Sequence, residues 1–283
     1  MNDMKSNSCV VVILTFNSAN IIQETLAQAL KVSQNIFVVD SGSKDGTPEI
    51  AQTMGAQVVD RVFANYSDQR NWAIGQISSQ YDWQLHLDAD EVLDEIAIAA
   101  INKVLNGNQS FNAYLIKRRD YFMGQMLRFS GVNPWHLRLF KSGFGQCENR
   151  LYDQHFVATC PTGKLDGLMH DKNSSNMAGW TASHNRWSDL EADQIMAETK
   201  TKDDVLQPRL LGDARERTRF IKSLYYRLPI GLRALSYFFY RYLFRLGFLD
   251  GVIGFYFAFF QAFWFRMLVD AKIYEKNLTK ELL

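Results

Sequence analysis

The first 120 residues alternate between short apolar or β-branched segments and segments with helical periodicity, and this alternation constrains the fold most. The segments that predict strands are Cys9–Thr15, Asn35–Asp40, Gln57–Val59, Trp83–Asp88 and Ala113–Arg119. Those that predict helices are Ala19–Val32, Thr47–Met54, Ser67–Ile77 and Leu93–Leu105. Such alternation predicts an α/β fold, with a Rossmann-like, mostly parallel sheet and flanking helices. Because ligands bind such sheets beyond the carboxyl ends of the strands, we expect a site among the polar residues that follow them.

Composition excludes several classes of protein. The 283 residues include 31 basic and 30 acidic side chains, and the net charge of +1 gives no field that would recruit nucleic acid. Hydrophobic residues make up 47%, which excludes a disordered chain. Cys9, Cys147 and Cys160 are too few and too scattered for a disulfide framework or a zinc site. The first residues carry no export signal, so we expect a cytoplasmic chain.

Two carboxylates lie at the end of the predicted strand Trp83–Asp88, in the run HLDADE at residues 86–91. Carboxylates separated by one residue at a strand end can hold a divalent cation and reach a ribose. The alternative is structural, with Asp88 or Asp90 as the N-cap of the helix that starts near Leu93. The spacing alone does not decide between the two.

A second polar cluster, VDSGSKDGT at residues 39–47, closes the second predicted strand. Asp40 could accept hydrogen bonds from a nucleobase edge, whereas Asp45 or Ser43 could cap the helix that follows. We therefore assign Asp40 to function and Asp45 to structure. The triplet TFN at residues 15–17 follows the first strand, where backbone and a short polar side chain could also meet a base.

Together, these strand ends in this order resemble an inverting family 2 glycosyltransferase with a GT-A fold. The resemblance is carried by Thr15-Phe16-Asn17, the VDSGSKDGT stretch, Gln69-Arg70-Asn71-Trp72-Ala73 and the LDADE stretch at Leu87–Glu91. It implies a nucleotide-sugar donor, which we expect to be a UDP-sugar. It also implies that the residues in contact with the nucleotide are Thr15, Phe16, Asn17, Asp40 and Arg70. It also implies that Asp88, with its neighbour Ala89, contacts the ribose and that Asp90 binds Mn²⁺ or Mg²⁺.

The resemblance extends to the branch that builds lipopolysaccharide core or exopolysaccharide chains. It rests there on Arg118–Gly124, Arg138-Leu139-Phe140 and the stretch from Gly163 to His170-Asp171. It implies that His170 completes the metal site; the alternative is a solvated or core histidine. Related sequences carry His-Glu where this chain has Asp153-Gln154, and that glutamate is the expected catalytic base. Because glutamine cannot accept the proton, Asp153 becomes the leading candidate, with Glu148 and His155 behind it.

Aromatic residues are concentrated at the carboxyl end, where 19 of the 38 lie from Phe220 onward. Between Arg209 and Arg245 nine lysines and arginines accompany only two acidic residues, among apolar positions at helical spacing. The uncharged run Gly251–Phe265 has 15 residues, fewer than the roughly 20 that span a bilayer, so we do not expect a single transmembrane pass. Aromatic, basic, amphipathic helices are typical of segments that lie in the bilayer interface. The alternative is that they pack on each other or on a partner subunit.

The predicted organisation is a GT-A domain over residues 1–210 and a helical membrane-interface segment over residues 211–283. Residues 1–120 form the nucleotide-sugar half, and residues 121–210, whose pattern is irregular, form the acceptor half. The predicted function is metal-dependent, inverting transfer of a sugar to a lipid-linked saccharide acceptor in lipopolysaccharide core or surface polysaccharide synthesis. We expect the chain to lie peripherally at the inner face of the cytoplasmic membrane, and an oligomer is compatible with the sequence.

Two other functions share parts of this pattern. A sugar nucleotidyltransferase uses the same α/β plan and metal-binding carboxylates, although no Gly-rich, basic loop for a triphosphate follows the first strand. A membrane-bound scaffold could bind a nucleotide sugar without turning it over, and the departure at residues 153–154 keeps that alternative open. A dehydrogenase is disfavoured, because no GxGxxG follows the first strand.

Overall fold

The computed structural model describes residues 8–149, 154–172, 176–200, 228–229 and 231–281 of the chain. The chain forms two compact units, the first comprising Met1–Met126 and Val132–Ser174 and the second comprising Leu127–Gly131 and Ser175–Leu283. It therefore passes from the first unit into the second at residue 127, returns at residue 132 and leaves again after residue 174. The expected boundary at residue 210 lies outside the described residues and stays a prediction, while residues 176–200 group with the second unit.

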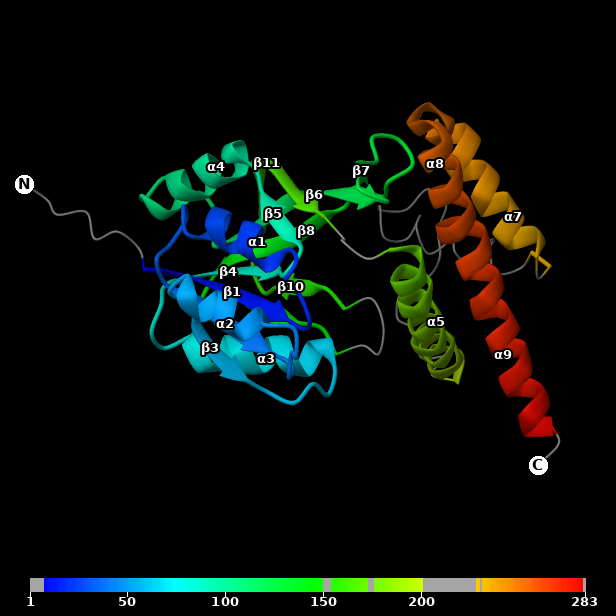
Figure 1. Ribbon diagram of the computed structural model, residues 1–283, viewed down its shortest axis with the longest axis horizontal. Coiled ribbons are helices and arrows are strands. Elements are labelled where there is room, and N and C mark those ends of the chain that lie inside the picture. The colour runs from blue at the N-terminus through cyan, green and yellow to red at the C-terminus, as the bar shows by residue number, and fades with distance from the viewer. Residues whose placement is uncertain (1–7, 150–153, 173–175, 201–227, 230, 282–283) are drawn as a thin grey trace, which may run out of the picture. The chain divides into compact units, whose positions relative to one another are not determined.

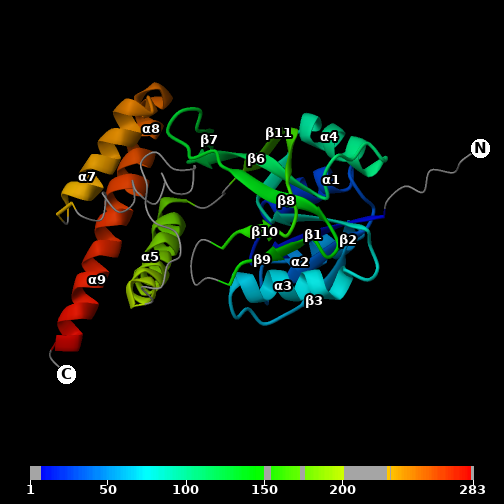
Figure 2. The same cartoon turned by 180° about the vertical axis from the view of Figure 1, so that it is seen from behind.

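A mixed sheet, nine-stranded in the described part of the chain, forms the centre of the first unit (Figures 1 and 2). In spatial order its main path runs β3 (Gln57–Asp60), β2 (Ile36–Asp40), β1 (Cys9–Thr15), β4 (Trp83–Asp88), β8 (Trp135–Lys141), β6 (Ala113–Phe122), β11 (Gly163–Asp171) and β5 (Glu91–Leu93), and β7 (Gln125–Met126) pairs with β6. The first four strands are parallel, whereas β8 and β5 run antiparallel to their neighbours. The predicted Rossmann-like parallel sheet is confirmed for these four strands.

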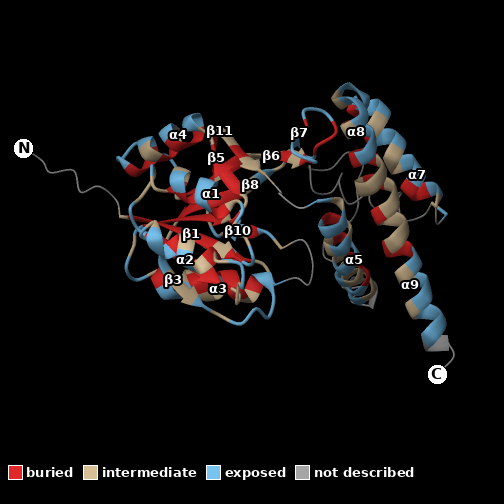
Figure 3. Cartoon of the chain, in the orientation of Figure 1, coloured by how far each residue is buried: buried red, intermediate tan, exposed pale blue. Residues whose placement is uncertain are grey.

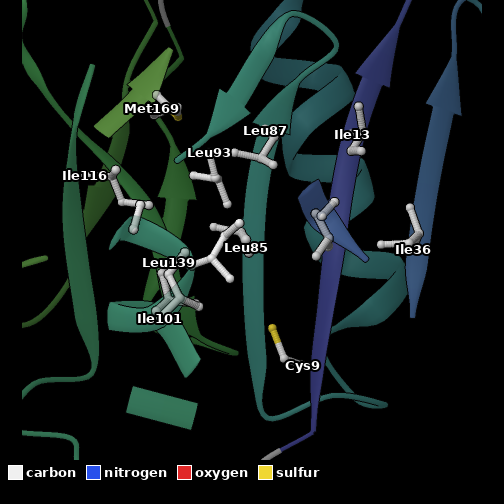
Figure 4. Packing of buried hydrophobic residues seen from close by; sticks show 14 of the residues in the cluster. Cys9, Ile13, Ile36, Leu85, Leu87, Leu93, Ile101, Ile116, Leu139 and Met169 are labelled. Atoms are coloured by element: carbon white, nitrogen blue, oxygen red, sulfur yellow. The ribbon is translucent and has the colours of Figure 1, made fainter. Parts of the chain in front are cut away.

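Helices cover both faces of this sheet around β1 and β2, and this explains why these two strands are almost entirely apolar. The helices are α1 (Ile22–Ala29), α2 (Thr47–Thr53), α3 (Tyr66–Ile77) and α4 (Glu95–Leu105). Alternate residues of β1 belong to different clusters: Val11 and Ile13 pack with residues of α1 and α4, whereas Val10 and Val12 pack with α3. Figure 4 shows part of the larger cluster, and Figure 3 shows that burial concentrates in the sheet.

The register of the strands brings several polar residues to one edge of the sheet. Thr15 pairs with Asp40 across β1 and β2, and Leu14 pairs with Asp88 across β1 and β4. Asp171, the last residue of β11, pairs with Glu91 of β5. This edge lies at the carboxyl ends of the parallel strands, where the sequence predicted the site.

The region expected to be irregular contains regular structure. Besides β8 and β11, the structure has a hairpin of β9 (Gly145–Cys147) and β10 (Phe156–Ala158), followed by the helix α5 (Met177–Lys200). Strand β11 was not predicted from the sequence because a bulge at Gly167, whose φ is +91°, interrupts the alternation of its side chains. A Cβ there would lie 2.1 Å from the backbone nitrogen of Ala97 at the start of α4, so only glycine fits.

The second unit is helical in its described part. Helix α7 (Leu232–Phe239) continues into the π-helical turn η1 (Tyr240–Phe244), and η2 (Gly247–Asp250) is a 3₁₀ turn. From there α8 (Gly251–Phe257), the π-helical η3 (Ala258–Trp264) and α9 (Phe265–Glu281) follow one another. Helix α7 packs on η3, and α5 packs on α9.

Ion pairs and an aromatic cluster hold the helices of the second unit together. Lys272 pairs with Asp189 at 2.8 Å and Lys276 with Asp193 at 2.6 Å, which joins α9 to α5. Deeper in the unit, His184 stacks on Trp180 with 3.4 Å between ring centroids. The Nδ1 of His184 lies 2.9 Å from the carbonyl oxygen of Trp180, and Nε2 lies 3.0 Å from the Gln261 side chain. Burial lowers the pKa of His184 to about 4.

The loop Leu127–Gly131 is tied to the turn before α8 by one carboxylate, an arrangement that we call the Asp250 clasp. Asp250 accepts hydrogen bonds from the backbone N–H groups of residues 128–130 at 2.7–3.0 Å and from the Ser130 hydroxyl at 2.7 Å. Arg241 donates to the carbonyl oxygen of Ser130. Although burial opposes its ionisation, these donors hold the pKa of Asp250 below its usual value.

The run Gly247–Thr279 is long and apolar enough to cross a membrane by length and composition alone. The sequence argument against a single pass considered only the uncharged residues 251–265. Length and composition do not decide between a spanning helix and a packed one, so the absence of a single pass stays a prediction. Charged residues of α9 are engaged within the unit: Asp270 binds the guanidinium of Arg233 from α7, and Arg266 binds Glu191 from α5.

Candidate active site

Asp40 organises the loop that follows β2. Its side chain is 2% exposed and accepts four hydrogen bonds, from the hydroxyl of Thr15 at 2.7 Å, the hydroxyl of Ser43 at 2.6 Å, and the backbone N–H groups of Gly42 at 2.9 Å and Ser43 at 2.7 Å. Both carboxylate oxygens are therefore engaged within the protein. A nucleobase that bound Asp40 directly would have to replace one of these donors.

The turn after β1 is fastened to the same loop. The side-chain oxygen of Asn17 accepts a hydrogen bond from the backbone N–H of Lys44 at 2.9 Å. The backbone N–H of Asn17 donates to the hydroxyl oxygen of Ser43 at 2.7 Å. Asn17 has a φ of +47°, which asparagine tolerates better than most residues. The neighbouring Phe16 is 61% exposed, so its ring is accessible to a planar ligand.

Asp45 has the structural role that the sequence assigned to it. Its carboxylate accepts from the Thr47 hydroxyl at 2.6 Å and from the backbone N–H groups of Thr47 at 3.2 Å and Ala19 at 2.9 Å. It thus joins the start of α2 to the turn after β1.

Asp88 lies between two buried guanidinium groups. Arg70, from α3, reaches both of its oxygens at 2.9 and 3.1 Å, and Arg138, from β8, reaches Oδ2 at 3.1 Å. Arg138 also pairs with Glu91, which is 2% exposed. Although burial opposes ionisation, the charges of Arg70 and Arg138 hold the pKa of Asp88 well below its usual range. Asp88 is consequently a fixed carboxylate, and its side chain stays 33% exposed.

Asp90 differs from Asp88 in having no arginine of its own. Within the described part of the chain it forms no ion pair. Burial, together with the charges of Asp88 and Glu91, raises the pKa of Asp90 to about 7. Neither Asp88 nor Asp90 caps α4, because Asp94 does so by accepting from the N–H of Ala97 at 2.7 Å. The capping alternative for the two aspartates is therefore wrong.

The acidic groups around Asp90 outnumber the basic ones. Burial and the charge of Asp90 raise the pKa of Asp171 well above its ordinary value, although Arg118 lies 3.4 Å away and opposes this. The described residues of this cluster are five carboxylates and three guanidinium groups, from Asp88, Asp90, Glu91, Asp120, Asp171, Arg70, Arg118 and Arg138. This excess of negative charge fits a bound divalent cation.

The protein ligands for such a cation are few. No three His, Cys, Asp or Glu side chains among the described residues lie close enough together to hold a metal ion by themselves. The Nδ1 of His170 lies 3.2 Å from the Tyr121 hydroxyl, and burial lowers the pKa of His170. Because side chains alternate along a strand, His170 and Asp171 point to opposite faces of β11. Asp90 and His170 remain predicted metal ligands.

The predicted base Asp153 lies outside the described residues. Of the other candidates, Glu148 accepts from the backbone N–H of His155 at 2.9 Å, which closes the base of the β9–β10 hairpin. Asn71, in the QRNWA stretch, holds this hairpin through two hydrogen bonds to the backbone of Cys147, at 2.8 and 2.9 Å.

Arg138 is the residue whose role the sequence reasoning missed. The sequence comparison included it only as part of a resembling stretch, whereas the structure shows it 4% exposed and bound to both Asp88 and Glu91. A signal was present, since a charged residue inside the apolar strand WHLRLFK needs a buried counter-charge. Arg118, which joins Asp120 at 2.9 Å to Asp171, was missed in the same way.

The fold and the site define a class of α/β protein with a carboxylate cluster at the carboxyl end of the central parallel strands. Residues 10–159, more than half of the chain, match the glycosyl transferase family 2. The chain belongs to this family, and its sheet topology is that of the GT-A fold. Membership favours a glycosyltransferase over the nucleotidyltransferase and dehydrogenase alternatives.

Two relatives illustrate the range of similarity. An uncharacterized glycosyltransferase of Rickettsia bellii is 28% identical over 173 residues, which cover 60% of this chain and 54% of that protein. The lipopolysaccharide core biosynthesis glycosyltransferase LpsC of Rhizobium meliloti is 26% identical over 264 residues, which cover 89% of this chain and 87% of LpsC. The chain thus spans about half the length of its Rickettsia relatives and most of LpsC.

Similarity to solved structures is weaker. Mannosyl-3-phosphoglycerate synthase from Rubrobacter xylanophilus is 13% identical with a TM-score of 0.43, covering 71% of this chain and 78% of that one. Glucosyl-3-phosphoglycerate synthase from Mycobacterium tuberculosis, crystallised with Mn²⁺, UDP and glucosyl-3-phosphoglycerate, is 19% identical with a TM-score of 0.33 and covers 41% of this chain and 44% of that one. These scores are low, and the fold assignment rests on the sheet topology and the family match.

Proposed function

We propose that this protein transfers a sugar from a nucleoside diphosphate donor to a saccharide hydroxyl with inversion at the anomeric carbon. The observation that carries the proposal is the carboxylate cluster at the end of β4, in which Asp88 is held by two arginines and Asp90 forms no ion pair with any described residue. Asp88 and Asp90 lie within the part of the chain that matches the glycosyltransferase family.

The donor nucleotide, a UDP-sugar, would bind along the edge formed by the ends of β1, β2 and β4. The exposed ring of Phe16 suits stacking against a base, and Thr15, Asn17 and Asp40 shape the loop beside it. Asp88, fixed by Arg70 and next to Ala89, suits hydrogen bonds to the ribose hydroxyls.

Asp90 would hold Mn²⁺ or Mg²⁺, and the excess of carboxylates over guanidinium groups supports its role as a ligand. His170 stays the proposed second ligand on the family resemblance, although its side chain points to the face of β11 opposite Asp171. A bound cation would stabilise the negative charge on the diphosphate leaving group. Arg138 and Arg70 keep Asp88 ionised, so that Asp88 is available as an acceptor throughout the reaction.

The chemical step is a single displacement. Asp153 accepts the proton of the acceptor hydroxyl while that oxygen bonds to the anomeric carbon. The bond from the anomeric carbon to the phosphate oxygen breaks, and the nucleoside diphosphate leaves on the opposite face. One displacement inverts the anomeric configuration.

The acceptor is proposed to be a lipid-linked saccharide of lipopolysaccharide core or surface polysaccharide. The similarity to LpsC over 89% of the chain supports this acceptor class. A lipid-linked acceptor would require the enzyme to work at a membrane, and the helical second unit, with its many exposed apolar side chains, supports peripheral association with the inner face of the cytoplasmic membrane.

The test is a nucleotide-sugar screen of the full chain with and without Mn²⁺, read first by thermal shift and then by product analysis. We expect a UDP-sugar to stabilise the protein in a Mn²⁺-dependent way, and UDP to be released when a lipid-linked acceptor is added. Release of pyrophosphate would support a nucleotidyltransferase instead. Binding without transfer, across a panel of acceptors, would support a scaffold.

A further inference from the structure

We propose that residues 243–252, the turn between α7–η1 and α8, enter the membrane surface end-on. We call this segment the apolar tip. The inference rests on the membrane association proposed above and names the residues that bring it about. It differs from the expectation of helices lying flat in the interface.

Exposed apolar side chains are concentrated at this turn. Six of the ten residues in the tip are large, apolar and exposed: Leu243, Phe244, Leu246, Phe248, Leu249 and Val252. Phe244 is 80% exposed and Val252 is 68% exposed. Among the described side chains of the 17-residue helix α9, the exposed large apolar ones are only Tyr274 and Leu278. Isolated exposed apolar residues are ordinary, whereas a contiguous group marks an interaction surface.

The backbone of the tip is built to hold these side chains outward. Leu246 has a φ of +58°, a left-handed conformation that reverses the chain between the two helical arms. The arms then run side by side, as both Figure 1 and Figure 2 show. At Gly254 an added Cβ would lie 2.1 Å from the carbonyl oxygen of Gly247, so the two backbones are in direct contact. The tip is consequently a closely packed turn.

The residues around the tip have the chemistry of a membrane boundary. Tyr240 and Tyr256 are 48% and 42% exposed, and each lies four residues from the tip residue Phe244 or Val252. Four residues of helix place these phenols about 6 Å behind the tip, at the depth that tyrosine prefers at a membrane boundary. Arg245 is exposed and can reach anionic headgroups, because a long side chain extends its charge toward water.

The only acidic residue of the tip, Asp250, is engaged by the Asp250 clasp. Its oxygens accept four hydrogen bonds from residues 128–130. Since these donors compensate its charge, the carboxylate of Asp250 does not strongly repel anionic lipid headgroups. The far end of the unit is different, because Lys272 and Lys276 of α9 form ion pairs with α5 there. This contrast between the tip and the α5–α9 end of the unit favours an orientation in which the tip meets the lipid.

A lipid surface fits the tip better than a second copy of the chain. A stable protein interface buries roughly 800 Å² of complementary surface on each partner. Neighbouring positions in the turn, such as Leu246, Phe248 and Leu249, are exposed one after another rather than along one helix face. A convex turn of this kind offers little flat surface to a partner, whereas a fluid bilayer adapts to it.

The experiment compares vesicle binding by the full chain and two double variants. The tip variant carries Phe244→Ser and Val252→Ser; the matched control carries Leu232→Ser and Leu278→Ser, which replace exposed apolar residues of the same unit outside the tip. Vesicles of phosphatidylethanolamine and phosphatidylglycerol serve as the probe. Because burying one large apolar side chain strengthens binding roughly tenfold or more, we expect the tip variant to lose at least about tenfold in vesicle affinity and the control to change about twofold or less.

A depth measurement gives an independent readout. Bimane is attached to Phe244→Cys or Leu278→Cys in a chain with Cys160→Ser, because Cys9 and Cys147 are buried. Brominated acyl chains in the vesicles should quench the label at position 244 and leave the label at position 278 unquenched. Thermal unfolding and Mn²⁺-dependent UDP binding, measured for each variant, verify that both units are folded.

The outcomes separate this inference from the function on which it rests. If the wild-type chain does not bind vesicles, the proposed membrane association fails and the tip inference fails with it. If the chain binds but the control variant loses as much affinity as the tip variant, or if the label at 278 is quenched equally, the end-on tip is wrong while membrane association stands. Resistance of the chain to extraction by alkaline carbonate would indicate a spanning helix and would also overturn the inference.

Discussion

The two units of this protein bury polar groups in opposite ways. In the first unit, the buried Glu91 and the partly exposed Asp88 are paired with the buried Arg70 and Arg138, and Asp90 is left without an ion pair among the described residues. In the second unit, His184 is buried as a neutral ring, and the polar atoms around it belong to the Trp180 backbone and to Gln261.

This difference separates a functional centre from a structural one. Polar groups that are satisfied within the fold, as His184 is, need nothing from outside the chain. A cluster in which carboxylates outnumber guanidinium groups is stabilised further by a cation, and its excess charge is where chemistry can occur. The comparison therefore predicts that a metal ion and a nucleotide bind to the first unit. It also predicts that low pH destabilises the core of the second unit.

The largest expected effect is on catalysis, in the Asp90→Asn variant. We expect turnover to fall about a thousandfold, because the substitution removes the carboxylate that would hold the cation on the leaving group. The measurement is UDP release in the presence of Mn²⁺, with Mn²⁺ binding followed by electron paramagnetic resonance. Asp60→Asn, which changes an exposed carboxylate at the end of β3, should leave both unchanged. Turnover that survives in Asp90→Asn would show that the metal assignment is wrong.

The second expectation concerns stability, in the Arg138→Met variant. Removing this guanidinium leaves the buried Glu91 without its ion-pair partner and Asp88 with Arg70 alone, which should lower the free energy of unfolding by about 3–5 kcal/mol. Denaturant unfolding together with hydrogen exchange in β4 and β8 measures the loss. The control is Lys31→Met, which removes an exposed pair with Glu95 and should cost less than about 1 kcal/mol. Equal losses in the two variants would contradict a special role for Arg138.

The third expectation is a pH dependence of the second unit. His184 has a folded pKa of about 4, below its unfolded value near 6.5, so between these values the unfolded chain binds more protons. Stability is therefore complete above about pH 6.5 and should fall by up to about 3 kcal/mol as the pH drops toward 4. Hydrogen exchange in α5, corrected for the intrinsic rate, follows this loss.

The comparison variant for this pH dependence is His184→Gln. Glutamine does not titrate, so the variant should lack this component of the acid sensitivity, whatever its absolute stability. If wild type and His184→Gln lose protection in α5 in parallel between pH 6.5 and 4, the histidine is not its cause.

The smallest expected effect is local and concerns the Asp250 clasp. Asn has one acceptor oxygen where Asp has two, so Asp250→Asn should lose part of the hydrogen bonding to residues 128–130 and cost about 1–3 kcal/mol. The amides of residues 128–130 should then exchange faster. The control is Asp193→Asn in the same unit, where the side chain of Asp193 is 51% exposed and pairs with Lys276. This substitution should leave the exchange of the amides of residues 128–130 unchanged. Unaltered exchange at residues 128–130 in Asp250→Asn would mean that the clasp does not hold the loop.

The sequence predicted the parallel half of the fold closely. The bounds of β1 and β4 agree with the predicted strands Cys9–Thr15 and Trp83–Asp88, because strands buried on both faces are continuous apolar runs bounded by polar turns. In the antiparallel half, β6 was predicted as Ala113–Arg119, whereas β8 and β11 were missed. Strand β8 carries a buried arginine and β11 carries a bulge at Gly167, and both features interrupt the patterns from which strands are predicted.

The residues of the candidate site were predicted better than their surroundings. The ends of β1, β2 and β4 meet as expected, and Asp45 has the structural role assigned to it. That Asp94 rather than Asp88 or Asp90 caps α4 could not be known from sequence, because all three aspartates lie shortly before the helix.

The sequence by itself determined the class of the protein, since the order of apolar segments and polar strand ends is a local property of the chain. Only the tertiary structure decided the electrostatics of the site. Arg70, Asp88 and Arg138 are separated by 18 and 50 residues, and sheet register and helix packing bring them into contact. The structure likewise decided which of the C-terminal aromatic residues are exposed at the apolar tip, because composition counts side chains whereas packing determines which of them water can reach.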